Sequence, residues 1–319
     1  MEVMKRVSLV LVVLTGFLFV PPVYAEDTLS SEMKDALSKE PRDSNTLIEK
    51  GKVFLDPKDS KPYSGRVFIH VSMSGKRIVD QRGLLIRGKA EGRWRAFYEG
   101  EKSMWESHFK RGKRHGQHRE WRKDGSKNFE VFYENDLMHG RFTSWAAEGK
   151  PLYRTLFEKG SGRAIYFYPH GTKSLEIPYV AGKTHGVQKS WSVDGFLYTE
   201  ANHLDGKRSG RTTTVGGDGH RTETYFRNDM KHGLMTRWNA KGRKIHEVHY
   251  EKGEQHGDDI QWGSDGLKQR SAQYQHGKQH GIERYIGVRE DGAFGLWTCQ
   301  WKQGVKGKCH FRQGETSLP

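Results

Sequence analysis

The chain has 319 residues and a formal net charge of +15; 34% of its residues are hydrophobic and 12% are aromatic. Globular domains are nearer half apolar, so this composition excludes an ordinary domain with a deep, two-sided core. The 38 glycines suit a β protein that is rich in turns. We therefore expect a thin structure with an aromatic-rich packing layer.

The first 25 residues have the features of a secretory signal peptide. Lys5 and Arg6 precede an apolar run over residues 7–20, and Ala25 ends the segment. The alternative is an uncleaved membrane anchor, but the run is shorter than the roughly 18 residues that a membrane span usually needs. We expect cleavage after Ala25, no transmembrane span in the mature chain, and export to the periplasm, the outer membrane or the medium.

A marker glycine recurs at steps of 22 to 24 residues from Gly92 to Gly281, and such a period is typical of repeat proteins. A histidine precedes the marker in six copies, and an aromatic residue follows it five positions later in seven copies. We assign a structural role in the repeat to these glycines and tryptophans: Gly116, Trp121, Gly140, Trp145, Gly186, Trp191, Gly233, Trp238, Gly257, Trp262 and Gly281.

Four copies also carry an Asp-Gly pair, which is a strong hairpin signal between two extended runs. In one copy we expect strands at residues 117–121 and 127–133, and a turn between repeats at residues 112–116. A single hairpin is marginal in water, so neighbouring hairpins must stack. The expected fold is an all-β, elongated single-sheet solenoid of about ten antiparallel β-hairpins.

This array should occupy residues 51–310. It follows a signal peptide at residues 1–25 and a polar linker at residues 26–50, in which Ser31 caps a short helix. Residues 311–319 form a C-terminal tail.

The repeat resembles the MORN repeat (membrane occupation and recognition nexus) in its bacterial variant form, whose members are often labelled YwqK-type antitoxins. Residues 61–65 resemble the first repeat of that family, and the resemblance covers about residues 51–310. It implies neutralisation of a toxin or effector, or binding at a membrane surface. Departures from the pattern are Val215 and Ile286 in place of tryptophan, and a copy at Gly162 that is two residues short. We expect these copies to be bent or loose.

The two cysteines, Cys299 and Cys309, lie ten residues apart around Gln303 and Gly304. Export permits a disulfide, and this spacing suits a bridge across a terminal hairpin. Closing so short a loop should contribute about 2–3 kcal/mol at best. A catalytic thiol pair is the alternative, but the C-x-x-C spacing is absent.

Sixteen histidines suggest metal binding, but equivalent residues of successive hairpins lie about 9–10 Å apart, whereas ligands lie about 2 Å from their metal. We expect the marker histidines to satisfy local backbone groups instead. The sequence contains no P-loop, zinc-protease motif or nucleophile elbow. We therefore expect no catalytic residue, no cofactor and no metal site.

Basic residues recur before the marker glycines and should line one edge of the array, as a candidate interaction surface: Lys113, Arg114, Lys183, Lys207, Arg208, Lys231 and Lys278. We expect a non-enzymatic scaffold that binds a protein partner or an anionic lipid or envelope polymer. An antitoxin-like neutraliser is the alternative that the resemblance suggests. No specific nucleic-acid partner is expected, and the oligomeric state stays open.

Overall fold

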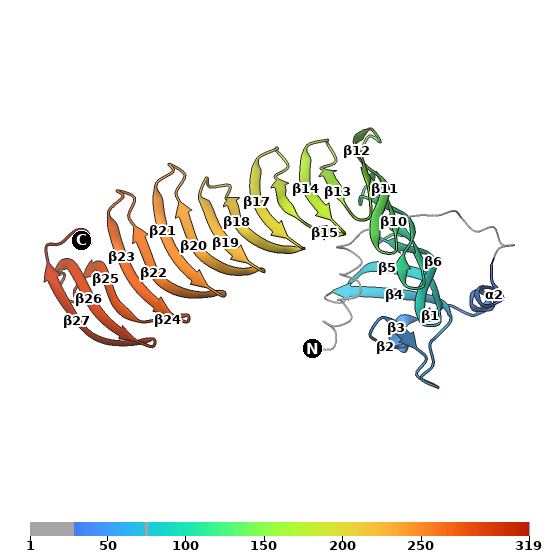
Figure 1. The fold of residues 1–319 in the computed structure, drawn as a ribbon, viewed down its shortest axis with the longest axis horizontal. Coiled ribbons are helices and arrows are strands. Elements are labelled where there is room, and N and C mark those ends of the chain that lie inside the picture. Colours follow the sequence, from blue (N-terminus) through green and yellow to red (C-terminus); the bar gives the residue numbers. More distant parts are fainter. Residues whose placement is uncertain (1–28, 74–75, 319) are drawn as a thin grey trace. The chain divides into compact units, whose positions relative to one another are not determined.

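A computed structural model describes residues 29–73 and 76–318 and confirms an all-β fold of stacked antiparallel hairpins (Figure 1). The predicted signal peptide lies outside the described residues. The chain divides into two compact units, residues 1–183 and residues 184–319. Within the described residues, no helix has the length and apolarity that crossing a membrane requires.

The first unit begins with a short helix and continues as a meander of antiparallel strands. Its long sheet has the order β1-β4-β5-β6-β7-β9-β10-β11-β12, β2 pairs with β3, and β13 pairs with β14. The elements are α2 (Ser31–Ser38), β1 (Arg42–Asp43), η2 (Ser44–Thr46), β2 (Ile48–Lys50), β3 (Val53–Leu55), β4 (Gly65–Met73), β5 (Lys76–Ile86), β6 (Lys89–Phe97), β7 (Ser103–Lys110), β8 (Lys113–Arg114), β9 (Gly116–Trp121), β10 (Lys127–Glu134), β11 (Leu137–Trp145), β12 (Pro151–Phe157), β13 (Gly162–Phe167) and β14 (Lys173–Val180).

The second unit is a simple meander, from yellow to red in Figure 1, in which neighbouring strands pair in chain order, except that both β24 and β25 pair with β23. Its elements are β16 (Gly186–Trp191), β17 (Leu197–Leu204), β18 (Lys207–Val215), β19 (Arg221–Arg227), β20 (Met230–Trp238), β21 (Lys244–Glu251), β22 (Glu254–Trp262), β23 (Lys268–Gln275), β24 (Lys278–Gln279), β25 (Gly281–Val288), β26 (Phe294–Lys302) and β27 (Val305–Gln313); β15 (Lys183–Thr184) contains the boundary between the units.

The turns between repeats are tighter than the sequence predicts. Arg111 and Gly112 both have positive φ, 53° and 78°, as a two-residue type I′ hairpin turn requires. Residues 113–114 already belong to a strand, and the marker Gly116 lies in the extended chain. At Gly140 the strand register shifts, so this marker lies in a β-bulge and not in the turn.

The Asp-Gly positions form longer turns. Arg122 N–H donates to the carbonyl of Ser126 and Gly125 N–H to that of Arg122, both at 2.8 Å. Only Gly125 has positive φ, while the Asp124 carboxylate accepts the Ser126 N–H at 2.8 Å. This geometry is typical of a type I turn closed by a left-handed glycine, and it leaves the type I′ turns to the other end of each hairpin.

The short copy at Gly162 interrupts the sheet. It lacks the two-residue strand that precedes the bulge elsewhere, such as β8, which pairs with the end of β7. β12 and β13 therefore meet only through the bridge between Glu158 and Ser161. Gly162 approaches the Phe157 ring so closely that a Cβ there would lie 2.7 Å from it.

This interruption creates a true hydrophobic core within the first unit, which the composition did not predict. Residues of β10–β12 pack together with residues of β13 and β14: Phe129, Val131, Tyr133, Met138, Phe142, Phe157, Ala164 and Tyr179. Phe142 is fully buried, and its ring centroid lies 5.6 Å from that of Tyr166 and 5.9 Å from that of Phe129. The sheet thus breaks after β12, and β13 and β14 pack on β10–β12; we call this break the bend.

The second unit keeps the thin construction that the composition predicts. Most of the central strands contribute one residue, usually small or polar, to a buried row. The buried residues that pair directly include Ala201 with Thr212, Thr212 with Thr224, and Val248 with Asp259. Short side chains in this row leave little apolar area to bury. Stability must therefore come mainly from contacts between neighbouring strands.

Residues 29–50 are a folded cap and not a linker. The N-cap of α2 is Ser30, whose Oγ accepts the Met33 N–H at 3.2 Å, one residue before the predicted cap. β1 pairs in parallel with β4, at Val67 and Phe68. The C-terminal tail is also shorter than predicted, because β27 continues to Gln313.

Candidate functional site

The predicted basic edge separates into two kinds of residue. Lys113, Lys183, Lys207 and Lys278 are exposed. The other three cations stack on aromatic rings of the following strand: Arg114 over Tyr133 at 5.3 Å, Arg208 over Phe226 at 4.3 Å and Lys231 over Tyr250 at 4.6 Å from the ring centroids. Cation–π contacts of this kind stabilise the repeat itself.

Two of these stacked cations also hold the type I′ turns. Arg114 Nε lies 3.1 Å from Asp136 Oδ1, with only 15% of the Arg114 side chain exposed. In the second unit the Arg208 backbone N–H donates to Asp229, and this hydrogen bond lowers the pKa of the Asp229 carboxyl. Since these guanidinium groups are engaged, they contribute little to a surface for partners.

The exposed row in the second unit is not continuously basic. Its four positions, at the starts of β18, β20, β22 and β24, are Lys207, Met230, Glu254 and Lys278. A neutral and an acidic residue thus separate the two lysines. Within that unit the row is a weak candidate for a long anionic ligand.

A stronger candidate lies in the first unit, between helix α2 and one face of strands β4–β7. This groove has a volume of about 850 Å³. Its apolar lining includes Leu29, Met33 and Leu37 from the helical side, and Phe68 and Leu84 from the strands. We call it the α2 groove.

Four arginines line the α2 groove: Arg66, Arg82, Arg93 and Arg95. Arg82 and Arg95 are cross-strand partners, so their side chains lie on the same face of the sheet. Glu91 is the one acidic residue in the described lining, so the groove is strongly cationic. An anion with an apolar portion matches this combination of charge and aliphatic surface.

The arginines differ in how firmly they are held. Arg66 Nη2 donates to the Lys39 carbonyl at 3.0 Å, and Arg82 Nη2 lies 2.7 Å from Glu101 Oε1. Arg93 Nη1 lies 3.7 Å from Glu106 Oε2, at the limit of an ion pair. Arg95 is exposed and has no polar partner among the described side chains. Arg93 and Arg95 are therefore the cations most available to a ligand.

His108, opposite Arg93 on β7, completes the polar lining. Burial lowers the pKa of His108, so its imidazole is neutral at pH 7 and adds no charge. The positive potential of the groove thus comes from guanidinium groups, which stay charged at every physiological pH.

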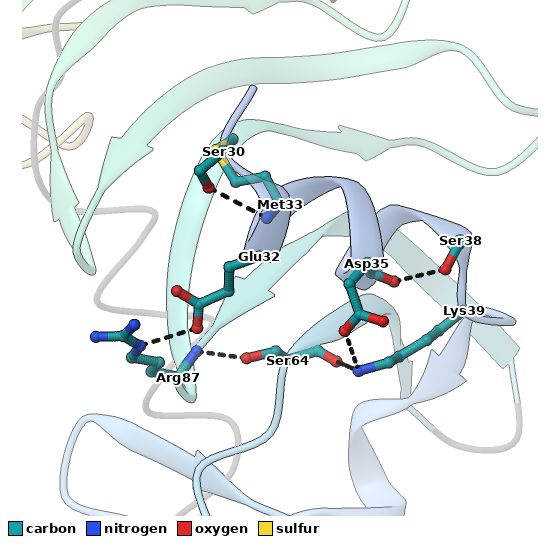
Figure 2. Close-up of polar contacts among 8 residues, drawn as sticks. All are labelled: Ser30, Glu32, Met33, Asp35, Ser38, Lys39, Ser64 and Arg87. Atoms are coloured by element: carbon teal, nitrogen blue, oxygen red, sulfur yellow. Dashed lines mark hydrogen bonds and ion pairs between the residues drawn. The ribbon is translucent and has the colours of Figure 1, made fainter. Parts of the chain in front are cut away.

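Helix α2 is anchored beside the groove by polar contacts at both ends (Figure 2). Glu32 Oε1 lies 2.8 Å from Arg87 Nε, and the Arg87 N–H donates to Ser64 Oγ at 2.8 Å. Lys39 Nζ donates to the Ser64 carbonyl at 3.2 Å and pairs with Asp35 at 2.9 Å. These contacts are mostly exposed and individually weak, so the helix is positioned more by their number than by any one of them.

The predicted structural residues take repeat-building roles. The indole rings of Trp145, Trp238 and Trp262 lie beneath cations of the preceding strand, at 4.5, 3.9 and 5.2 Å from Lys127, Arg221 and Lys244. Cys299 and Cys309 are paired across β26 and β27 and form a disulfide. Three of the marker histidines do not use Nδ1 to bond to the backbone: the Nδ1 atoms of His185, His256 and His280 are buried without a hydrogen bond in the described structure.

A polar network that the sequence did not reveal crosses five strands of the second unit. His246 Nε2 lies 2.9 Å from Asp259 Oδ1, and Arg270 Nη1 lies 3.7 Å from Asp259 Oδ2. Arg270 also contacts Glu283 at 2.8 Å, and Trp301 Nε1 donates to Glu283 at 2.9 Å. The two buried carboxylates are thereby neutralised, which is what buried charges require. We assign this network to the stability of the sheet.

Metal binding finds no support among the described side chains, because no group of three or more histidine, cysteine or acidic residues is arranged to hold an ion. No protein-family model matches the chain, and no curated protein matches it. The α2 groove therefore rests on its own geometry. The sequence signal for it was modest: Arg93 and Arg95 alternate with the buried Trp94 and Ala96.

Proposed function

We propose that the protein is a non-enzymatic, exported binding scaffold, and that the α2 groove holds an extended anionic segment of a protein partner. The supporting observation is the joint presence of four arginines and an aliphatic wall in one groove of about 850 Å³. We also propose that the chain is related to the variant MORN repeats, and the period of its hairpins supports this. No specific feature favours a toxin over other protein partners.

A protein segment suits the groove better than a membrane surface does. The groove lies between a helix and a sheet face, so its ligand must enter as a chain and cannot be a flat surface. Carboxylates or phosphorylated side chains of such a segment would meet Arg93 and Arg95, while aliphatic side chains would contact Met33 and Leu37. Guanidinium groups bind these anions with two parallel hydrogen bonds.

The test is a pull-down from cell-envelope extract with residues 26–319, at low and high salt. A double variant, Arg93→Gln with Arg95→Gln, removes the two available cations. The matched control is Arg141→Gln with Arg154→Gln, which removes the same charge from exposed positions of β11 and β12 outside the lining.

We expect one protein partner to bind the parent and the control, and to bind the groove variant about tenfold more weakly, as loss of two partly exposed ion pairs implies. Equal binding by both variants would refute the groove as the binding site. Recovery of anionic lipid or polymer alone, lost at high salt and equally from both variants, would show that net charge is responsible and would contradict the proposal.

A further inference from the structure

The last strand of the second unit, β27, is an open sheet edge. β27 pairs with β26, and no described strand pairs with its other side. A row of backbone N–H and C=O groups therefore faces outward along nine residues. At the start of the first unit the sheet edge is partly covered, because β1 pairs with β4 at Val67 and Phe68.

β27 also corresponds to the first strand of a repeat. In complete repeats the strand that follows the type I′ turn is paired with a second strand, as β9 is with β10, β18 with β19 and β22 with β23. β27 follows the turn at Gln303 and Gly304, both with positive φ, and so takes the place of a first strand. No described strand takes the position of a second strand beside it.

In three complete repeats the second strand supplies a glutamate to a cation of the first. The pairs are Arg119 with Glu130 at 3.8 Å, Lys189 with Glu200 at 2.8 Å and Arg211 with Glu223 at 3.5 Å. These contacts lie on the sheet face opposite the buried central row, which includes Thr212, the residue after Arg211. In these repeats the second strand is thus complementary in charge to the first.

The same face of β27 carries exposed basic residues. Cys309 pairs with Cys299, which belongs to the buried central row. Lys308 and His310 flank Cys309 in sequence and therefore lie on the opposite face, just as Arg211 does beside Thr212. Lys308, His310 and Arg312 are all exposed, and the described structure gives Lys308 no acidic partner. Arg312 lies 3.7 Å from Glu315, which is also largely exposed.

An apolar hollow adjoins the beginning of this edge. It has a volume of about 400 Å³, and Trp301 and Val305 contribute to its lining. Val305 is 70% exposed, which is unusual for a strand residue of this type. The disulfide between Cys299 and Cys309 pins β27 to β26, so the edge is held ready for a ligand.

From these features we infer that β27 accepts an acidic, extended segment of a partner protein, which adds to the sheet as an antiparallel strand. Its glutamates or aspartates would face Lys308 and His310, and an apolar side chain would fill the hollow at Val305. A second copy of β27 is a poor occupant, because the two strands would place lysine, histidine and arginine against one another. The inference concerns a surface separate from the α2 groove and does not depend on it.

The repeat itself provides the probe. A blocked peptide with the sequence of β10, residues 127–134, carries the second-strand pattern with two glutamates. The matched peptide has lysine in place of Glu130 and Glu134. Binding of both peptides to residues 26–319 is measured by titration calorimetry, and the contact is located by hydrogen exchange of the β27 amides.

We expect the acidic peptide to bind, to protect β27 amides from exchange, and to bind at least tenfold more tightly than the lysine peptide. Lys308→Glu with Arg312→Glu should reverse this preference, while the control Lys207→Glu with Lys278→Glu should retain it. The inference is overturned if neither peptide binds, if binding leaves β27 unprotected, or if the charge reversal has no effect. Protection of β27 by self-association of the protein without peptide would also overturn it.

Discussion

Replacing Phe142 by alanine should selectively destabilise the first unit. The ring is fully buried, and its centroid lies within 5.6 to 6.3 Å of the rings of Phe129, Tyr153, Phe157 and Tyr166. Truncation of such a phenylalanine costs about 3–5 kcal/mol, because the lost contacts leave a cavity that a packed core fills only partly. In a repeat array the loss should stay local.

Native-state hydrogen exchange resolves this local effect. The slowest amides of β10 and β11 should lose about 3–5 kcal/mol of protection, whereas those of β20 and β21 should be unchanged. The control is Met235→Ala, at the equivalent position two residues after its marker glycine; Met235 is only half-buried in the thin second unit. A loss below about 1 kcal/mol for Phe142→Ala, or an equal loss for Met235→Ala, would refute the assignment of a core to the bend.

Three further predictions concern single contacts. Arg114→Ala should lower the free energy of unfolding by about 3 kcal/mol in urea denaturation, because it removes a largely buried guanidinium from a carboxylate and a ring. The neighbouring Lys113→Ala should change it by less than about 0.5 kcal/mol. Equal effects would contradict the division of the basic edge into stacked and exposed cations. Burial lowers the folded-state pKa of His118 below the ordinary histidine value of about 6.5, so the unfolded chain takes up the proton first. Stability should therefore fall below about pH 6.5, by at most about 1.4 kcal/mol per pH unit, and the slope should be smaller in His118→Leu. Cys299→Ser with Cys309→Ser should lower the hydrogen-exchange protection of the β27 amides by about 2–3 kcal/mol. A uniform loss across the second unit would contradict a purely local effect of the disulfide.

The periodic part of the fold could be predicted from sequence because it depends on local rules. The strands expected at residues 117–121 and 127–133 are β9 and β10 to within one residue. Turn chemistry was assigned less well, since an Asp-Gly pair supports both a type I′ turn and a type I turn with a left-handed glycine. Only the φ angles, positive at Arg111 but not at Asp124, distinguish them.

The bend and the α2 groove depend on contacts that the repeat pattern does not contain. The short copy at Gly162 predicted a local irregularity, but the core appears only when β13 and β14 pack on β10–β12. Likewise, Arg66 and Arg95 lie 29 positions apart, and the sheet brings them to one groove below a helix that lies outside the repeats. Tertiary packing, and not local propensity, places these residues.

The net charge of +15 has a structural origin as well as a functional one. A single sheet cannot cover its aromatic rings with a second layer, and here cations do so, as Arg208 does for Phe226 and Lys244 for Trp262. A cation that is stacked on a ring in this way is less available to bind a partner. Further basic residues lie towards the two ends of the described array, in the α2 groove beside the N-terminal cap and at Lys308 and Arg312 of the last strand. A partner that depends on charge should therefore bind where exposed cations such as Arg95 and Lys308 have no acidic partner in the described structure.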